Sequence, residues 1–201
     1  MFIFGITGGT GAGKTSALRA LKSIGALTLD CDAVYHELLL KNEEMKSKLA
    51  SRFGDVLRSG AIDRARLGEI AFNDPSALRD LNAITHKYVS AEIGRKIAQW
   101  DAGGGKAVAA IDAIALIESG IGEKCDVVVG VTAPAEVRIS RIMRRDCITR
   151  ELAQMRINAQ KPDSFYRENC DYIIESKHKR PADFEEACKK FFADILKEKN
   201  T

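Results

Sequence analysis

A run of glycines that ends in lysine and threonine lies near the start of this sequence. Its residues, Gly8-Gly9-Thr10-Gly11-Ala12-Gly13-Lys14-Thr15, follow the pattern G-x-x-x-x-G-K-T of a phosphate-binding loop. Glycine permits backbone angles with positive φ, so successive N–H groups can point into one concavity and hold phosphate oxygens. Lys14 can reach the outer phosphates of a ligand, and the hydroxyl of Thr15 can ligate Mg²⁺. With Ser16, these residues form the predicted binding site of a phosphate donor.

The segments on both sides of this loop are those that the chemistry requires. Residues 1–7 form a short apolar run that is typical of a buried parallel strand, and residues 16–24 have apolar side chains at helical spacing. The loop is therefore predicted to lie between a strand and a helix, whose N-terminus adds partial positive charge. This context favours a phosphate site over the alternative, a glycine-rich turn that binds nothing.

Two aspartates follow the second predicted strand. This strand begins after a turn at Gly25 and ends at Asp30, and Asp32 comes one residue later. Ligands of an open α/β sheet bind outside the carboxyl ends of its strands, so both carboxylates are expected near the phosphate loop. Asp32 could orient and deprotonate an acceptor hydroxyl as a catalytic base. The alternative is that Asp32 caps the helix predicted over residues 33–40, whereas Asp30 is expected to have a structural role.

A third predicted strand, residues 106–112, ends on an acid. An aspartate at the end of an apolar strand is the arrangement in which a carboxylate binds Mg²⁺ directly or through water. Asp112 is therefore predicted to contribute to the metal site together with Thr15.

Four arginines lie on a helix predicted over residues 136–146. Arg138, Arg141 and Arg145 are spaced so that they share one helix face. The chain breaks after this helix, and a second helix is predicted over residues 150–160. Two arginine-rich helices joined by a short turn are typical of a lid over phosphates, because a guanidinium group binds phosphate at two points and stacks on a base. Arg141 is predicted to stack on the base of the donor and Arg145 to bind its phosphates; a surface helix with excess charge is the alternative.

Residues 35–100 are rich in helical patterns and show no convincing strand. A long helical pattern covers residues 74–97, with His86 as the candidate position of a break. This block is too long for a simple crossover between strands, so it is predicted to be an insertion that covers the acceptor. The alternative for the basic residues of this block is that they are solvated surface charges and bind no substrate. The predicted acceptor-binding residues are Asp32, Arg64, Arg66, His86 and Glu118.

The remaining segments complete an α/β pattern. Residues 125–131 and 169–174 are predicted as the fourth and fifth strands, and residues 181–199 as a closing helix with an apolar packing face. The nucleotide-binding core would then comprise residues 1–34 and 101–201, with the lid at about 138–162, and the acceptor-binding insertion would comprise residues 35–100.

Whole-chain composition narrows the function classes. The 31 basic and 28 acidic residues give a net charge of +3, which suits anionic small molecules and does not argue for nucleic acid. The five cysteines include no C-x-x-C pair, so neither a disulfide framework nor a zinc site is indicated, and a reducing compartment is expected. No apolar run approaches the roughly 18 residues of a membrane span, and no signal peptide precedes the first strand, so a cytoplasmic protein is predicted.

The residues resemble those of the dephospho-coenzyme A kinases, a family of P-loop nucleoside and nucleotide kinases, over almost the whole chain. The phosphate loop is common to very many proteins. The more specific part of the resemblance lies in Asp30-Cys31-Asp32, in the lid sequence of residues 140–146, and in Ala159-Gln160. Residues 62–68, 81–86 and 170–174 also match the family.

The resemblance implies a fold and a reaction. The fold is the three-layer α/β P-loop kinase fold, a five-stranded parallel sheet in the order 2-3-1-4-5 with a helical substrate-binding insertion and a helical lid. ATP, with Mg²⁺, would phosphorylate the ribose 3′-hydroxyl of dephospho-coenzyme A to give coenzyme A and ADP, the last step of coenzyme A biosynthesis. The catalytic residues would be Asp32 as the base, Lys14 and Arg145. No nucleic acid, membrane or protein partner is implied.

The sequence departs from the family pattern in three places. Ile114 and Ala115 replace Pro and Leu after the third strand, and Lys87 replaces the Pro after His86; both changes concern the acceptor pocket. Residues 175–177 replace an Asn-Gly at the adenine end of the ATP site.

Two alternatives to this reading are another nucleoside or nucleotide kinase and a nucleotide-dependent switch that hydrolyses ATP slowly. The lid arginines and Asp32 favour phosphoryl transfer over a switch, because a kinase must exclude water from the γ-phosphate.

Overall fold

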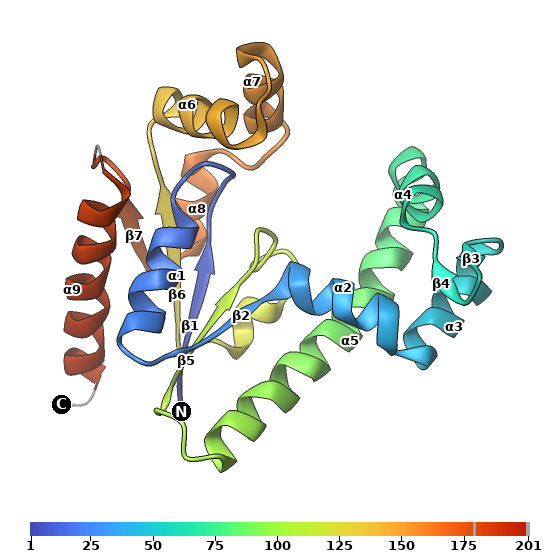
Figure 1. Cartoon of the computed structure of the whole chain (residues 1–201), viewed down its shortest axis with the longest axis horizontal. Helices are drawn as coiled ribbons and strands as arrows, with labels where there is room; N and C mark the ends of the chain where they lie inside the picture. The colour runs from blue at the N-terminus through green and yellow to red at the C-terminus, as the bar shows by residue number, and fades with distance from the viewer. Residues whose placement is uncertain (179, 200–201) are drawn as a thin grey trace. The chain divides into compact units, whose positions relative to one another are not determined.

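The computed structural model, which describes residues 1–178 and 180–199, contains a five-stranded parallel sheet (Figure 1). The sheet order is β2-β5-β1-β6-β7. Numbered along the chain within this sheet alone, the strands have the order 2-3-1-4-5, as predicted. Their bounds are β1 Phe2–Thr7, β2 Leu27–Asp30, β5 Val108–Asp112, β6 Val127–Thr132 and β7 Tyr172–Glu175.

The chain divides into two compact units, which are described separately here. The first unit comprises Met1–Leu29 and Gly103–Thr201, and the second comprises Asp30–Ala102. In the part of the chain that the structure describes, no helix is long and apolar enough to cross a membrane.

The core of the first unit lies where helices α1 (Lys14–Ser23) and α9 (Pro181–Lys199) pack together and against the sheet. Phe4 of β1 and Phe192 of α9 meet edge to face, with ring centroids 5.1 Å apart. Both side chains are fully buried, together with Phe184 and Cys188 of the same helix. The prediction that the aromatic residues of the closing helix are core packing is confirmed, and this packing holds α1 in place behind the phosphate loop.

Two helices, α6 (Ala135–Asp146) and α7 (Arg150–Asn158), form the predicted arginine-rich pair. They pack through Ile139, Ile142 and Ala153. The turn between them places Cys147 at a φ of 52°, and the hydroxyl of Thr149 accepts a hydrogen bond from the N–H of Leu152 to cap α7.

Two short helices were not predicted from the sequence. They are the 3₁₀ helix η1 (Ile121–Lys124) and the seven-residue helix α8 (Asp163–Asn169). The fifth strand was predicted to start at Asn169, which instead ends α8. A helix of two turns shows too few repeats for its period to be recognised.

The second unit is mainly helical but contains a β-hairpin. Its helices are α2 (Cys31–Lys41), α3 (Glu43–Phe53), α4 (Arg64–Asn73) and α5 (Pro75–Ala102), and strands β3 (Leu57–Arg58) and β4 (Ala61–Ile62) pair antiparallel. The prediction that this block holds no strand is wrong. Ser59 and Gly60 both have positive φ, which is the geometry of a tight two-residue hairpin turn, and strands of two residues are too short to show alternation.

Helix α5 is continuous over 28 residues, so a break near His86 is also wrong. The N–H of a non-proline residue continues the helical hydrogen-bond ladder, and Lys87 stands where a proline would remove that donor.

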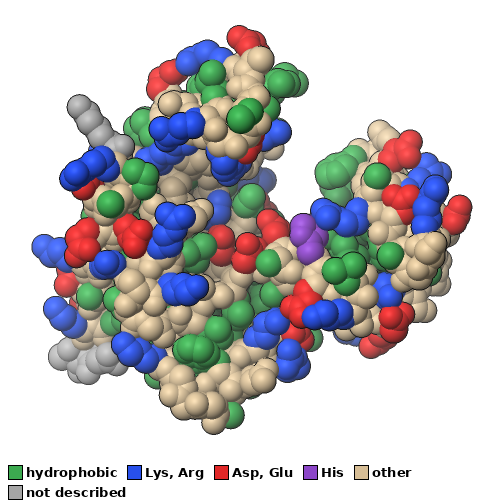
Figure 2. Space-filling model, viewed as in Figure 1, with side chains coloured by type: hydrophobic (Ala, Val, Ile, Leu, Met, Phe, Trp, Pro, Cys, Tyr) green, Lys and Arg blue, Asp and Glu red, His purple; other side chains and the backbone are tan. Residues whose placement is uncertain are grey.

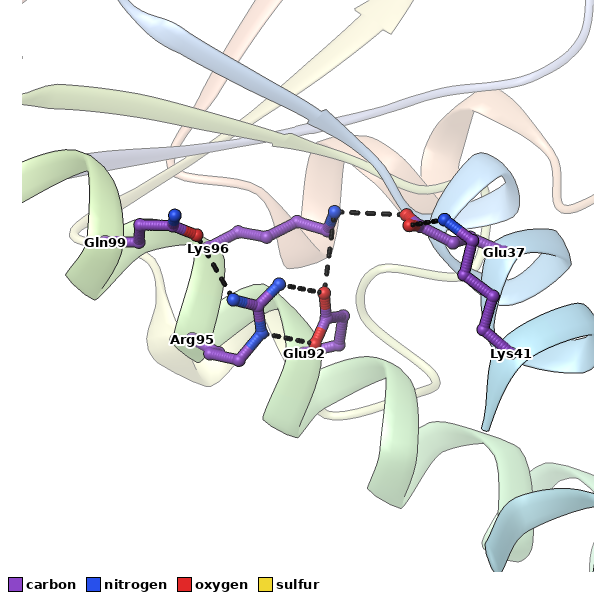
Figure 3. A network of polar contacts seen from close by, with 6 residues as sticks. All are labelled: Glu37, Lys41, Glu92, Arg95, Lys96 and Gln99. Atoms are coloured by element: carbon purple, nitrogen blue, oxygen red, sulfur yellow. Dashed lines mark hydrogen bonds and ion pairs between the residues drawn. The ribbon is translucent and has the colours of Figure 1, made fainter. Parts of the chain in front are cut away.

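A network of charged side chains joins α2 to α5 within the second unit (Figure 3). Lys96 of α5 donates one hydrogen bond to Glu37 of α2 at 3.1 Å, and its Nζ also lies 3.5 Å from the carboxylate of Glu92. Lys41 bonds Glu37 from within α2 at 2.9 Å. The hydrogen bond with Lys41 is the main cause of a lowered pKa at Glu37, and the one with Arg95 is the main cause at Glu92.

We expect Lys96→Met to lower the melting temperature by about 2 °C, because it removes the ion pair that crosses between two helices. Lys41→Met is the matched control: the side chain of Lys41 is 73% exposed, against 26% for Lys96, and its ion pair stays within one helix.

A carboxylate with a lowered pKa stabilises the fold at higher pH and loses this contribution as the pH falls. The difference between wild type and Lys96→Met, measured by thermal melts, should therefore shrink as the pH drops below 4.5, the ordinary pKa of glutamate. Equal melting temperatures at neutral pH would contradict this role.

Candidate active site

The phosphate loop joins β1 to α1 and lies directly against β6. Gly8 follows β1 with a φ of 139°, and Gly13 precedes α1 with a φ of 114°. A Cβ atom on Gly8 would lie 2.1 Å from the carbonyl oxygen of Val131 in β6. Only glycine therefore lets the loop leave the sheet at this point, and the N-terminus of α1 faces the carboxyl end of the strands, where a phosphate is expected.

Lys14, the first residue of α1, reaches back across the loop. Its Nζ donates a hydrogen bond to the carbonyl oxygen of Gly8 at 2.7 Å. Next to it, Thr15 is exposed, whereas Ser16 is buried and its N–H bonds the carbonyl oxygen of Gly13 at 2.9 Å. The ammonium group is thus placed over the phosphate loop, and the hydroxyl of Thr15 is accessible to a metal.

The outer side of the loop is bound by two residues from the predicted lid. Arg138 donates from Nε to the carbonyl oxygen of Thr10 at 2.9 Å, and from a terminal nitrogen to Oε1 of Gln160 at 2.8 Å. The same Oε1 accepts the N–H of Thr10 at 2.8 Å, and Nε2 of Gln160 donates to the Thr10 hydroxyl at 2.8 Å. The sequence placed Arg138 on the arginine face of the predicted lid but gave it no individual role, and the only signal for Gln160 was its place in the Ala159-Gln160 match.

Arg141 also contacts the loop. Its guanidinium donates to the carbonyl oxygens of Gly11 at 3.1 Å and Ala12 at 3.2 Å, and to the hydroxyl of Ser176 at 2.9 Å. Burial, and secondarily the charge of Arg144, lowers the pKa of Arg141. The sequence departure at residues 175–177 therefore supplies a partner to this arginine, because Ser176 is fully buried beneath it. Stacking of Arg141 on a base remains a prediction.

Arg145 lies in the last turn of α6. The surface of the molecule seen in Figure 2 carries basic side chains with acidic and apolar ones among them. It donates two hydrogen bonds to Asp146, at 2.7 and 3.0 Å, and Arg156 of α7 binds the same carboxylate. These bonds, first that of Arg145, lower the pKa of Asp146. The side chain of Arg145 is 62% exposed. A phosphate could therefore replace Asp146 as its partner or bind beside it. That role remains a prediction.

Asp112 ends β5, as predicted, and pairs in register with Ile6 of the neighbouring strand β1. Among residues 1–178 and 180–199, no three His, Cys, Asp or Glu side chains are close enough to hold a metal by themselves. Mg²⁺ at a phosphate site is usually held by only one or two protein oxygens, with substrate phosphates and water completing its shell. The hydroxyl of Thr15 and the carboxylate of Asp112 fit this kind of site.

In the second unit, Asp30 and Asp32 have different surroundings. Oδ1 of Asp30 accepts the N–H groups of Asp32 at 2.8 Å and Ala33 at 3.1 Å, which makes Asp30 the N-cap of α2. The structural role expected for Asp30 is confirmed, and the alternative that Asp32 is the cap is wrong, because the helix begins two residues earlier than predicted. The carboxylate of Asp32 is exposed on the first turn.

The other predicted acceptor-binding residues lie on different elements, and their shared role in binding remains a prediction. Arg64 is exposed on α4, and its charge opposes the burial that raises the pKa of Tyr35 on α2. Arg66 pairs with Glu69 at 2.8 Å. His86 lies half-buried on α5, and burial lowers its pKa. Glu118 belongs to the first unit, where it is exposed and contributes, after burial, to the raised pKa of Tyr166.

Comparison with known proteins places this geometry in a family. The family model described as dephospho-CoA kinase matches residues 2–181. The chain belongs to the dephospho-CoA kinase family. A dephospho-CoA kinase of Moorella thermoacetica is 37% identical over 162 residues, which cover 80% of this chain and 76% of the relative. One from Corynebacterium glutamicum is 32% identical over the full length of both chains.

A solved structure of the family has the same fold. The dephospho-CoA kinase from Campylobacter jejuni superposes with a TM-score of 0.70 and 28% sequence identity, covering 98% of each chain. The resemblance inferred from the phosphate loop, the two aspartates and the lid sequence is therefore confirmed at the level of family and fold.

Proposed function

We propose that this chain transfers the γ-phosphoryl group of ATP to the ribose 3′-hydroxyl of dephospho-coenzyme A, giving coenzyme A and ADP in the last step of coenzyme A biosynthesis. The observation that carries this proposal is the family match over residues 2–181, which includes the complete phosphate loop. Phosphoryl transfer needs mainly positioning and charge stabilisation, and the loop, Lys14 and the arginines of α6 provide both.

In this reaction the N–H groups at the start of α1 and the ammonium of Lys14 hold the donor phosphates and oppose the charge that develops during transfer. Thr15 and Asp112 would hold Mg²⁺, which would neutralise charge on the phosphate oxygens. Arg145 would bind the phosphates and Arg141 the adenine. The loop contacts of Arg141 support its presence at the donor site.

Asp32 is proposed as the base that orients the acceptor hydroxyl and takes its proton. Its exposed carboxylate and the assignment of the helix cap to Asp30 support this role. Arg64, Arg66, His86 and Glu118 are proposed to bind the acceptor, whose phosphates and ribose are suited to basic and hydrogen-bonding groups. The proposed compartment is the cytoplasm, and the proposed small-molecule partners are ATP and dephospho-coenzyme A.

An assay that couples ADP release to a spectroscopic signal tests this function. With ATP and Mg²⁺, ADP release should depend on dephospho-coenzyme A, and mass spectrometry should find one phosphate added to the ribose 3′-oxygen. Equal ADP release without acceptor would instead indicate a nucleotide-hydrolysing switch. Faster turnover with a simple nucleoside or nucleotide would indicate a different kinase of the same fold.

A further inference from the structure

Two side chains from a distant part of the chain form hydrogen bonds with the tip of the phosphate loop. Thr10 of the loop, Arg138 of α6 and Gln160, which follows α7, form the four hydrogen bonds described above; we call this group the Thr10 clamp. Gln160 uses both ends of its carboxamide, because Oε1 accepts two hydrogen bonds and Nε2 donates one. Asparagine is shorter and could not span the same partners without moving the chain.

Arg138 is the buried member of the clamp, and Thr10 and Gln160 are half-buried. Arg138 is only 5% exposed, and a buried guanidinium is costly unless its donors are satisfied. Besides Thr10 and Gln160, it lies 3.6 Å from the carboxylate of Asp163 at the start of α8. A Cβ atom on Gly9 would lie 2.2 Å from a terminal nitrogen of Arg138 and 3.0 Å from Oε1 of Gln160. The second loop glycine is therefore required by the clamp.

Two amides at the tip of the loop are bonded within the protein. The N–H of Thr10 is used by Gln160, and that of Ala12 bonds the carbonyl oxygen of Gly9 at 3.2 Å. Both bonds bend the tip into a fixed turn ahead of α1. The loop shape that precedes the N-terminus of α1 thus depends on a glutamine 150 positions away.

The clamp holds both ends of the α6–α7 pair as well. Arg138 lies in the first half of α6, and Gln160 lies just beyond the last residue of α7. Because both contact Thr10, the base of the helix pair is joined to the loop, whereas the turn around Cys147 is exposed.

We infer that Gln160 is a positioning residue for phosphoryl transfer: acting through Thr10, it holds the phosphate loop in the shape that binds the donor and fixes the base of the lid on that loop. The expected effects on turnover rest on the proposed kinase function. The expected effect on ADP binding does not, because ADP binding tests the loop without any acceptor. Gln160 itself need not touch the nucleotide.

The test compares Gln160→Ala, Gln160→Glu and a control, Gln154→Ala. Gln154 lies on α7 of the same helix pair, and its amide makes one exposed hydrogen bond, to Asn158 at 2.8 Å. For Gln160→Ala we expect the Kd for ADP and the KM for ATP to rise about 10-fold, while the KM for the acceptor stays unchanged. Gln160→Glu should recover most of this loss, because a carboxylate still accepts from Thr10 and Arg138. Gln154→Ala should behave as wild type.

A double-mutant cycle with Thr10→Ala adds a second criterion. If the residues act as a unit, the effects of Thr10→Ala and Gln160→Ala on ADP affinity should combine to less than their sum. The inference is overturned if Gln160→Ala keeps wild-type ADP affinity, or if it only lowers the melting temperature and leaves both KM values unchanged. It is also overturned if both KM values rise together, since that would indicate general disruption of the fold.

Discussion

Replacing Lys14 by alanine is expected to lower kcat about 100- to 1000-fold, the effect typical of removing one main electrostatic contact to a transition state. Lys14 begins α1 and its ammonium already lies over the loop, bonded to the carbonyl oxygen of Gly8. As the bond to the γ-phosphoryl group breaks, negative charge grows on the oxygen that bridged the β- and γ-phosphates, and the ammonium group stabilises that charge. Steady-state ADP release at saturating substrates measures the change.

The control for Lys14 lies on the same helix. Lys22 is an exposed lysine in the last turn of α1, and Lys22→Ala should leave kcat unchanged. Lys14→Arg separates charge from shape, because its larger planar group should restore charge but fit the loop poorly, so only part of the rate should return. Near-normal turnover of Lys14→Ala would mean that the phosphate loop is not the active site.

Replacing Asp32 by asparagine is expected to lower kcat about 100-fold or more, which is the usual contribution of a general base. A ribose hydroxyl is a poor nucleophile until its proton has an acceptor. Asparagine keeps the size and one oxygen of the side chain but cannot take the proton. Affinity for ATP and the melting temperature should therefore stay near those of wild type, as binding and thermal measurements would show.

Asp30, two residues earlier, provides the matched control. Because its carboxylate caps α2, Asp30→Ala should lower the free energy of unfolding by about 1 kcal/mol, whereas Asp30→Asn, which retains a capping oxygen, should not. The two aspartates should thus show opposite phenotypes, one in rate and the other in stability. A wild-type kcat for Asp32→Asn would place the base elsewhere, with Asp112 as the next candidate.

The sheet and the place of the phosphate site could be predicted because both depend on local patterns. Apolar runs such as residues 127–131 identify buried strands, and the loop motif with Lys14 identifies the strand and helix that flank it. The sheet order came from the resemblance to the family and not from these patterns. The ends of the elements were predicted less well. Helix α2 begins two residues earlier than predicted, so its N-cap is Asp30 and not Asp32. A cap depends on the backbone geometry of one turn, which periodicity does not resolve.

The short hairpin β3–β4 shows a second limit of local patterns. Two residues in each strand cannot show alternation, although Ser59-Gly60 marked the turn between them. The opposite error was made for α5. A break in this helix was predicted near His86, but the helix is continuous because each residue there has a backbone N–H that can donate to the helical ladder.

The sequence by itself was enough to predict a phosphate site at residues 8–16, since the glycines, the lysine and the start of the helix are adjacent in the chain. Only the tertiary structure decided what holds that loop in shape. Arg138, Arg141 and Gln160 contact it from more than a hundred positions away, and Ser176 accepts a hydrogen bond from Arg141. Their roles follow from burial. An arginine on a solvated helix is a surface charge that water can satisfy, whereas a buried arginine must donate its hydrogen bonds to acceptors inside the protein. Here the acceptors are the backbone carbonyls of the phosphate loop and the side chains beside them.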